Sequence, residues 1–432
     1  MATAPHISPM DTVSRKLPLV AHRAVNSGAG TKGGRLVSLS GIGEGSVYGQ
    51  QLEVVEASNE TLLLRHSDGR VREYIDLLSA YGAVNFGHCN PEINPFRHFS
   101  SDIAACFYPP EAATFCAWIV RYLNLQDYEV LFQVGGSMAV TAALSIAQQK
   151  KAGKIAYLKG SFHGLGIDAL SITNVHREYA LQSALLGITD ESKFLCLDYS
   201  SDVAPPPEEI AWDEVSCLIY EPVQGANGYI PVPRGWLQAI INKAKEHDVM
   251  VIADEIQSGF FRHGSLSVAR QAKMNSDIYL FSKSLTNGLY PFSIVLYPTA
   301  FRRELKHSFY LAHTFQTSAL GCFAMYEVSR FIDSHDIDQM CSNVELELEM
   351  FASVLRAQEI ERVYVSGPTL SFEAPAGLAK PIVQRCLSKG VLVFSGGPSL
   401  NRIRVAPPVT IKLDHLRMAL DVLHEALLDQ LS

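Results

Sequence analysis

Lys283 and Asp254 are the two side chains of this sequence with the clearest potential for chemistry. Each lies at the end of an apolar run that is typical of a buried strand, DIYLFSK at residues 277–283 and VMVIADE at residues 249–255. A lysine at the end of an apolar strand loses stabilisation of its charge, so its pKa falls and its amine becomes a nucleophile. A carboxylate in the corresponding position can keep a ring nitrogen protonated by Coulombic attraction. Taken alone, such a lysine is more often a solvated surface group, and such an aspartate a helix cap or a partner in a surface ion pair.

Two glycine-containing turns add further candidates. Gly135, Gly136 and Ser137 separate the apolar run YEVLFQV from a helical pattern, and a glycine backbone, the free N–H groups of a helix start and a hydroxyl together suit a phosphate. Phe162 and His163 closely follow the run KIAYLKG, where an aromatic ring could stack on a flat ligand. A tight strand-to-helix turn and a core aromatic are the simpler alternatives for these two stretches. As a set, however, a phosphate-binding turn, a stacking aromatic, an acid for a ring nitrogen and a Schiff-base lysine are the parts that pyridoxal phosphate requires.

These candidates can meet if the apolar runs form one mostly parallel sheet, because ligands collect beyond the carboxyl ends of the strands in open α/β sheets. Between several of the runs lie amphipathic helices such as residues 236–248, in which Leu237, Ile240, Ile241 and Ala244 fall on one face. Strands that are buried on both faces and separated by helices indicate an α/β fold. The predicted strands are residues 128–134, 154–160, 193–199, 215–223, 249–255 and 277–283.

The pattern along the chain predicts an N-terminal arm and two domains. Residues 1–45 are rich in Gly, Ser and Thr and predict an irregular arm. Residues 46–105 contain a hairpin pattern around the turn Ser67-Asp68-Gly69 and form the first part of a small domain. Residues 106–304 form the large cofactor-binding domain, and residues 305–432 complete the small, α+β domain.

Composition narrows the class of protein. With 432 residues, of which 47% are hydrophobic and 19% charged, the chain is an ordinary globular protein with at least one large core. A net charge of −8 supplies no basic field for nucleic acid or an anionic membrane, so neither partner is expected. The eight cysteines show no zinc-ligand spacing, and we expect free thiols, no metal and a cytoplasmic location. No run reaches the roughly 18 apolar residues of a membrane span.

Several longer stretches carry a resemblance to a known family. They are LLSAYGAVNFGHCNPEI, EPVQGANGYIPVPRGWL, VMVIADEIQSGFFRHG, DIYLFSKSLTNGLYPFSIVL, HTFQTSALGC and RIRVAPPVTIKLD. In order and spacing they resemble the class III, fold-type I aminotransferases that depend on pyridoxal 5'-phosphate, and within that family the ornithine aminotransferases. The resemblance covers about residues 60–430. It implies a mostly parallel central sheet with helices on both faces, plus a smaller α+β domain built from the N- and C-terminal parts.

The resemblance also implies roles for the residues around the cofactor. Lys283 would form the Schiff base, Asp254 would bind the pyridine nitrogen, and Gln257 would lie near the phenolic oxygen. Phe162, followed by His163, would lie against the ring, and Gly136 and Ser137 would bind the phosphate. Thr314 would bind the phosphate of the neighbouring subunit's cofactor, so the active sites would be shared within a homodimer.

Arg404 and Tyr81 match the substrate-binding residues of the family. The arginine would clamp a substrate carboxylate through its planar fork, and the tyrosine would line the pocket. Two positions depart from the pattern. Ala226 stands where ornithine-type relatives carry a glutamate that pairs with the clamping arginine, and Leu165 stands where they carry a second arginine. We therefore expect substrates with one carboxylate near Arg404 and an apolar or amine-bearing remainder, and poorer handling of ornithine than the overall similarity suggests.

The expected activity is amino transfer by a ping-pong route. The donor would be an amine or amino acid, such as a diamino acid or another omega-amine, and the acceptor a keto acid or an aldehyde. Another outcome of the same chemistry, as in an aminomutase, a racemase or a decarboxylase, is the alternative within the enzyme class. A homologue that has lost catalysis and serves as a binding protein is the alternative outside it, against which the joint presence of Lys283, Asp254 and Gln257 argues.

Overall fold

The computed structural model describes residues 52–66, 68–98, 107–176, 190–200, 204–305 and 311–431. The predicted N-terminal arm, residues 1–45, and Ser67 of the predicted turn lie outside these ranges. Within them, no helix combines the length and the apolar character needed to cross a membrane.

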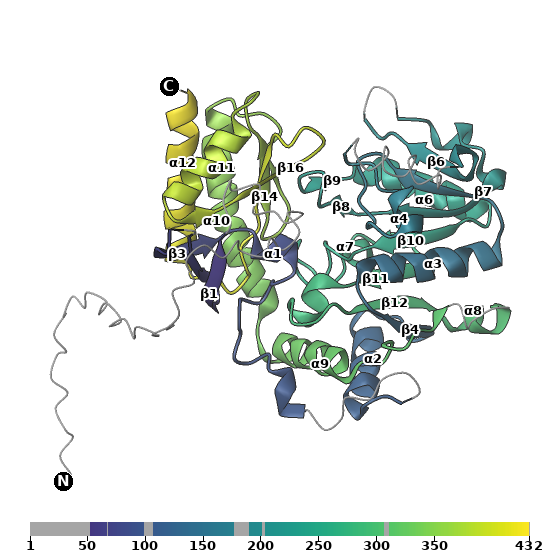
Figure 1. The fold of residues 1–432 in the computed structure, drawn as a ribbon. Coiled ribbons are helices and arrows are strands. Elements are labelled where there is room, and N and C mark those ends of the chain that lie inside the picture. The colour runs from purple at the N-terminus through teal and green to yellow at the C-terminus, as the bar shows by residue number, and fades with distance from the viewer. Residues whose placement is uncertain are drawn as a thin grey trace, which may run out of the picture. The chain divides into compact units, whose positions relative to one another are not determined.

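The largest element is a seven-stranded sheet with the strand order β4, β12, β11, β10, β7, β5, β6 (Figure 1). Strand β12 runs antiparallel to both of its neighbours, and the other adjacent pairs are parallel. All strands except β12 therefore end at the same edge of the sheet. The bounds are β4 Tyr128–Gln133, β5 Lys154–Leu158, β6 Phe194–Leu197, β7 Val215–Tyr220, β10 Met250–Asp254, β11 Ile278–Phe281 and β12 Ser293–Pro298.

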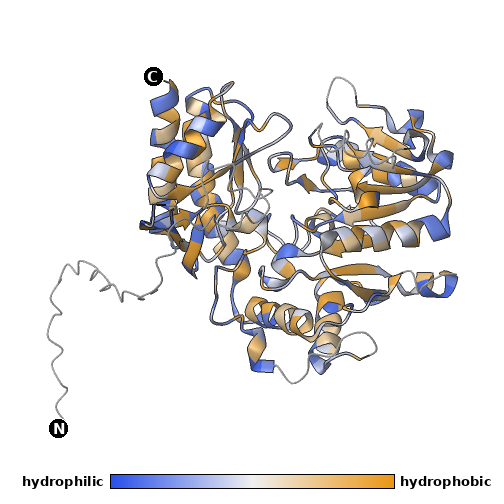
Figure 2. Cartoon of the chain, in the orientation of Figure 1, coloured by the Kyte–Doolittle hydropathy of each residue, from blue (hydrophilic) through white to orange (hydrophobic). Residues whose placement is uncertain are grey.

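The six strands predicted from apolar runs are all present in this sheet, and β12 is the strand that the predicted set lacks. Both faces of the sheet are covered, as the continuous apolar runs require. In β10, Val251 and Ala253 pack into one cluster with helices α2 and α6, while Met250 and Ile252 pack into another cluster with helix α3. Figure 2 shows these central strands in the hydrophobic colours. The covering helices are α2 Pro110–Tyr122, α3 Gly136–Lys150 and α6 Arg234–Glu246.

A smaller α+β part joins the two ends of the described chain. The predicted hairpin is present as β2 and β3, which pair antiparallel from Thr61 opposite Ile75. Strand β3 also pairs in parallel with β15, near the C-terminus, where Val391 lies opposite Ile75. This small part is therefore built from segments near both ends of the described chain.

The small part contains two four-stranded sheets, ordered β1, β2, β3, β15 and β13, β14, β17, β16. Their strands are β1 Glu53–Ser58, β2 Thr61–Arg65, β3 Val71–Asp76, β13 Tyr364–Val365, β14 Leu370–Glu373, β15 Val391–Leu392, β16 Phe394–Gly396 and β17 Arg402–Val405. Its helices are α10 Ile337–Ala357, α11 Ala379–Ser388 and α12 Leu413–Leu431. The remaining α-helices and strands of the described residues are α1 Ser79–Gly82, α4 Ile167–Leu170, β8 Val223–Gln224, β9 Ile230–Pro231, α7 Val268–Gln271, α8 Thr299–Glu304 and α9 Ala319–Ser334.

Helix α9 packs against α2 and belongs to the hydrophobic cluster of the large sheet, through residues such as Cys322, Met325 and Val328. Helix α9, which precedes α10 in the chain, thus shares a hydrophobic core with the large sheet. The domain boundaries drawn from the sequence stay predictions.

Candidate active site

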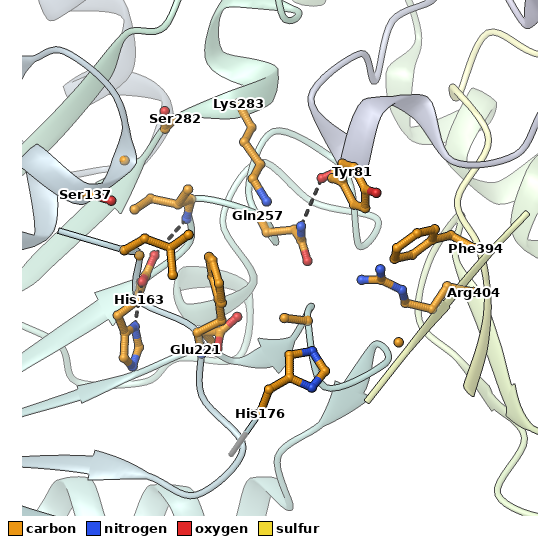
Figure 3. A pocket seen from close by; sticks show the side chains of 18 of the residues that line it. Tyr81, Ser137, His163, His176, Glu221, Gln257, Ser282, Lys283, Phe394 and Arg404 are labelled. Carbon is orange, nitrogen blue, oxygen red and sulfur yellow. Dashed lines mark hydrogen bonds and ion pairs between the residues drawn. The ribbon is translucent and has the colours of Figure 1, made fainter. Parts of the chain in front are cut away.

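A cavity of about 490 Å³ lies where the strands of the large sheet end. Its walls contain every predicted site residue except Thr314, which is exposed and does not line it. Figure 3 shows Lys283, Gln257 and Arg404 extending into the same space. The predicted residues in the wall are Tyr81, Gly136, Ser137, Phe162, His163, Asp254, Gln257, Lys283 and Arg404. The two departures from the family pattern, Ala226 and Leu165, line it as well.

Lys283 begins a short 3-10 helix, Lys283–Thr286, directly after β11 and Ser282. Its backbone has a φ of 48°, a left-handed conformation that is uncommon for a residue with a side chain. The serines on either side hold this turn: Ser282 Oγ donates to the carbonyl of Phe292 at 2.7 Å, and Ser284 Oγ donates to the carbonyl of Gly82 at 2.6 Å. The fold therefore fixes a strained backbone at the position of the candidate nucleophile.

Asp254 is the last residue of β10, and its carboxylate is buried beside His163. The His163 Nδ1 atom lies 2.7 Å from Asp254 Oδ2, and Asp254 Oδ1 accepts the backbone N–H of Ile256 at 3.1 Å. Asp254 and His163 are 3% and 2% exposed. A buried pair of this kind orients the carboxylate, because one of its oxygens is held by the imidazole and the other by the backbone.

The adjacent carboxylate, Glu255, serves another purpose. Successive side chains of a strand point to opposite faces, and Glu255 accepts hydrogen bonds from Ser267 Oγ and, at 2.5 Å, from the backbone N–H of Val268 at the start of α7. Burial raises the pKa of Glu255 to about 7 against these hydrogen bonds, which lower it. The carboxylate of Asp254 thus lines the cavity, whereas that of Glu255 binds the start of helix α7.

The glycine turn after β4 is open, as a phosphate site requires. Gly135 has a φ of 79°, and no atom lies within 4 Å of the place where a Cβ would stand. Gly136 begins the 15-residue helix α3, so its first backbone N–H groups are available for an anion. A Cβ on Gly136 would lie 3.0 Å from the Ile256 side chain, so a small residue is needed there.

Glu221 is a buried acid of the cavity wall that sequence reasoning missed. It follows β7, and its two oxygens accept the backbone N–H groups of Phe162 at 2.8 Å and Gly225 at 3.2 Å. Burial, with a smaller contribution from Asp254, raises its pKa to about 7, although His163 acts in the opposite direction. The signal was available, because Glu221 directly follows the apolar run VSCLIY in the way that Asp254 ends its own run. His176 and Phe394 also line the cavity and were not predicted.

Arg404 enters the cavity from β17 and is 4% exposed. Its Nη1 atom donates to the carbonyl of Gly225 at 3.1 Å. Across the cavity, Gln257 Nε2 donates to the carbonyl of Tyr81 at 2.9 Å, which links the large sheet to α1. Tyr81 has a φ of 59°, so this link fixes a left-handed backbone next to the ring that lines the cavity.

Three buried polar atoms of residues in the wall have no hydrogen-bond partner among the described residues, namely Gln257 Oε1, His163 Nε2 and Arg404 Nε. Buried polar atoms are normally hydrogen-bonded, so these atoms favour a polar ligand. Together with the open glycine turn and the carboxylate of Asp254, they fit the phosphate, the ring and the oxygen of a pyridoxal phosphate molecule.

Comparison with solved structures identifies the class of fold to which the chain belongs. Two solved structures share the fold: an ornithine aminotransferase from Toxoplasma gondii, with a TM-score of 0.74, 21% identity and coverage of 88% of this chain and 90% of that one, and an amine transaminase from an uncultivated Pseudomonas species, with a TM-score of 0.76, 20% identity and coverage of 88% and 95%. The chain has the fold of the fold-type I transferases that depend on pyridoxal phosphate.

Within that class the chain belongs to the class-III aminotransferase family, whose model matches residues 47–427. Curated relatives include the 4-aminobutyrate aminotransferase GabT of Escherichia coli, which is 25% identical over 399 residues, with coverage of 82% of this chain and 89% of the relative. The mitochondrial ornithine aminotransferase of Rattus norvegicus is 27% identical over 379 residues, with coverage of 83% and 82%. The protein is therefore a pyridoxal-phosphate-dependent aminotransferase, as the sequence predicted.

Proposed function

We propose that the protein moves an amino group from an amine or amino acid to a keto acid or an aldehyde in two alternating half-reactions, with Lys283 as its catalytic base and acid. The observation that carries this proposal is the convergence of Lys283, the Asp254–His163 pair and the Gly136–Ser137 turn on one cavity, with Arg404 in its wall. A lysine, a carboxylate and a helix N-terminus in one cavity meet the needs of a cofactor that carries an aldehyde, a ring nitrogen and a phosphate.

The Asp254–His163 pair would hold the ring nitrogen of the cofactor in its protonated form. The buried carboxylate favours a positive charge at that nitrogen by Coulombic attraction, and His163 keeps the carboxylate oriented. A protonated ring of this kind acts as an electron sink when the cofactor is bound. Phe162 would cover one ring face, and Gly136, Ser137 and the start of α3 would hold the phosphate.

Lys283 would carry the cofactor between turnovers and then move a proton. After the donor amine displaces it, the Nζ atom of Lys283 would take a proton from the substrate carbon and pass it to the cofactor carbon that gains the amino group. The strained turn around Lys283 supports this role, because it fixes the backbone from which the amine has to reach two neighbouring carbons.

Arg404 would bind the substrate carboxylate. No carboxylate of the described residues forms an ion pair with it, and Ala226 stands in the wall where related enzymes are expected to supply one. Leu165 leaves the wall without a second arginine, so a second substrate carboxylate would find no matching charge there. Substrates with one carboxylate and an apolar or amine-bearing remainder fit this charge pattern.

We also infer a homodimer with shared active sites. Thr314 is exposed and outside the cavity of its own chain, as a residue that serves a partner's site would be. Phe315, next to Thr314 in the sequence, is 60% exposed, and Phe107 and Tyr108 are 68% and 67% exposed. Thr317 Oγ1 donates a hydrogen bond to the carbonyl of Phe107 at 2.7 Å, which joins the two segments in the fold. Exposed aromatic side chains that lie close together are typical of a protein interface. We also propose a cytoplasmic location, because the described cysteines are free thiols.

A half-reaction screen tests the proposal. The holoenzyme is mixed with single amines, and the absorbance of the cofactor is followed while the keto product is assayed. We expect formation of the aminated cofactor and of one equivalent of keto product with the parent protein. Lys283→Ala should fold, bind the cofactor without a covalent link and lose turnover by several orders of magnitude. Turnover close to that of the parent in Lys283→Ala would refute the role of the lysine, and loss of carbon dioxide or isomerisation without a keto product would refute amino transfer.

A further inference from the structure

The guanidinium of Arg404 is held between three aromatic rings, which we call the aromatic box: Tyr81, Tyr229 and Phe394. The Cζ atom of Arg404 lies 4.9 Å from the ring centroid of Phe394, 5.5 Å from that of Tyr229 and 5.8 Å from that of Tyr81. The negative face of an aromatic ring attracts a cation. Figure 3 shows Phe394 beside Arg404, with Tyr81 above them.

The rings of the aromatic box also pack against one another or against neighbouring rings. Tyr81 and Phe394 meet edge to face, with ring centroids 5.0 Å apart and an interplanar angle of 88°. Tyr229 packs edge to face on His263 at 5.6 Å, and both of these residues are buried. Rotation of Arg404 to another orientation would therefore have to displace rings that are packed against one another.

Gly396 and Gly225 fix the remaining sides of Arg404. A Cβ on Gly396 would lie 2.7 Å from Arg404 Nε and 3.0 Å from Cζ, so the absence of a side chain lets the guanidinium lie flat against the backbone. The carbonyl of Gly225 accepts from Nη1 at 3.1 Å. Nε is buried without a hydrogen-bond partner among the described residues, so packing against the rings and Gly396 positions this side of the guanidinium.

The box differs from a carboxylate counter-ion in one physical respect. A carboxylate neutralises the guanidinium and has to move away before a substrate carboxylate can bind, which gives such a site two states. Aromatic rings orient the cation and exclude water but carry no formal charge, so the full positive charge stays available in every state of the site. Ala226, which lines the cavity next to Gly225, contributes no charge.

We propose that the aromatic box, Gly225 and Gly396 hold Arg404 as a fixed receptor, so that donor and acceptor must both present a carboxylate at the same distance from the reacting carbon. This inference rests on the proposed role of Arg404 and deepens it. Lys283 is fixed at one point of the cavity and Arg404 at another, and a receptor without a second orientation admits one spacing between the reacting carbon and the carboxylate. Phe394 and Gly396 act through Arg404 and are positioning residues.

Two homologous substrate series test the spacing. The donors are alanine and the straight-chain omega-amino acids from 3-aminopropanoate to 7-aminoheptanoate, and the acceptors are the oxo acids of the same lengths. We expect kcat/KM to peak at the same chain length in both series for the parent protein. Peaks at different chain lengths would overturn the fixed receptor.

Binding of unreactive carboxylates provides a readout that does not depend on turnover. Butanoate, pentanoate, hexanoate and heptanoate are titrated into the holoenzyme by calorimetry. Phe394→Leu should weaken binding at the preferred length by roughly 3- to 30-fold, the range that corresponds to the loss of one cation–π contact, and should flatten the dependence on length. Gly396→Ala should weaken binding as well, while Gly235→Ala, where a Cβ would meet no atom within 4 Å, is the matched control.

Arg404→Met separates this inference from the proposed function. If Arg404→Met abolishes binding of the carboxylates while Phe394→Leu and Gly396→Ala leave affinity and length dependence unchanged, Arg404 is the receptor and the aromatic box does not fix it. If Arg404→Met binds the carboxylates as the parent does, the role proposed for Arg404 is itself wrong. Loss of binding in Arg404→Met together with weakened, length-tolerant binding in the other two variants is the expected result.

Discussion

At the scale of the residue, the buried Asp254 is the group whose charge the proposed chemistry most needs. Asparagine at this position keeps the shape and the contact with His163 but removes the charge that would keep the ring nitrogen protonated. We expect Asp254→Asn to slow the first half-reaction with an amine donor by roughly 100-fold or more, the size of effect seen when one electrostatic group of an active site is removed. Stopped-flow absorbance of the bound cofactor measures this rate. A rate equal to that of the parent would contradict the assigned role.

The residues proposed to bind or act on the cofactor could be found in the sequence. The residues that shape the pocket around Arg404 were not found there. Lys283 and Asp254 lie at the ends of apolar runs, and Ser137 follows its run after two glycines, so local pattern and strand geometry were enough to bring them together. Glu221 obeys the same rule and was overlooked. Tyr229 carries no such signal, because it becomes a partner of Arg404 only through packing between segments that are distant in the chain. Phe394 lies opposite Arg404 in the adjacent strand, and its role depends on the register of that strand pair.

At the scale of the element, the carboxylate of Glu255 anchors the start of α7, and its raised pKa makes this anchor dependent on pH. The folded-state pKa of about 7 lies above the reference value of 4.5. The group therefore contributes stability that is fully present below about pH 4.5 and is lost as the pH rises through 7. Glu255→Gln cannot titrate at this position. The Tm of the parent minus the Tm of the variant should therefore be larger at pH 5 than at pH 8.

The matched control for this prediction is Glu214→Gln, an exposed acid that pairs with Lys154 on the surface. Its effect on Tm should be small at both pH values, because surface ion pairs contribute little to stability. Thermal unfolding followed by circular dichroism gives all the values. An equal difference in Tm between parent and Glu255→Gln at pH 5 and pH 8 would show that Glu255 does not titrate in this range.

Strands that are buried on both faces could be predicted from the sequence. Which strands pair with each other was harder to predict. Six strands of the large sheet stand out as apolar runs because helices cover both of their faces. Strand β12 has a similar run, SIVLYP, but it closely follows the Lys283 turn and was assigned no strand of its own. The parallel pair of β3 with β15 joins residues more than 300 positions apart, and no local pattern encodes such a contact.

At the scale of the whole molecule, the proposed dimer makes each site depend on two chains. Thr314 would donate to the phosphate of the cofactor bound by the partner subunit, while Lys283 would serve the site of its own chain. A hydrogen bond to a charged group contributes about 1.5–3 kcal/mol, so Thr314→Val should weaken cofactor binding by roughly 10-fold or more. Titration of the apoenzyme with pyridoxal phosphate measures this loss.

Complementation between two defective subunits separates a shared site from a site within one chain. A heterodimer of Lys283→Ala and Thr314→Val subunits, isolated by co-expression with two affinity tags, has one site with neither lysine nor threonine and one site with both. We therefore expect half of the parent's activity per dimer at limiting cofactor, with the cofactor affinity of the parent at the active site. If Thr314 instead served its own chain, the site that retains Lys283 would keep the weakened affinity of the Thr314→Val homodimer. Activity no higher than that of the Thr314→Val subunits alone would thus exclude a threonine shared across the interface.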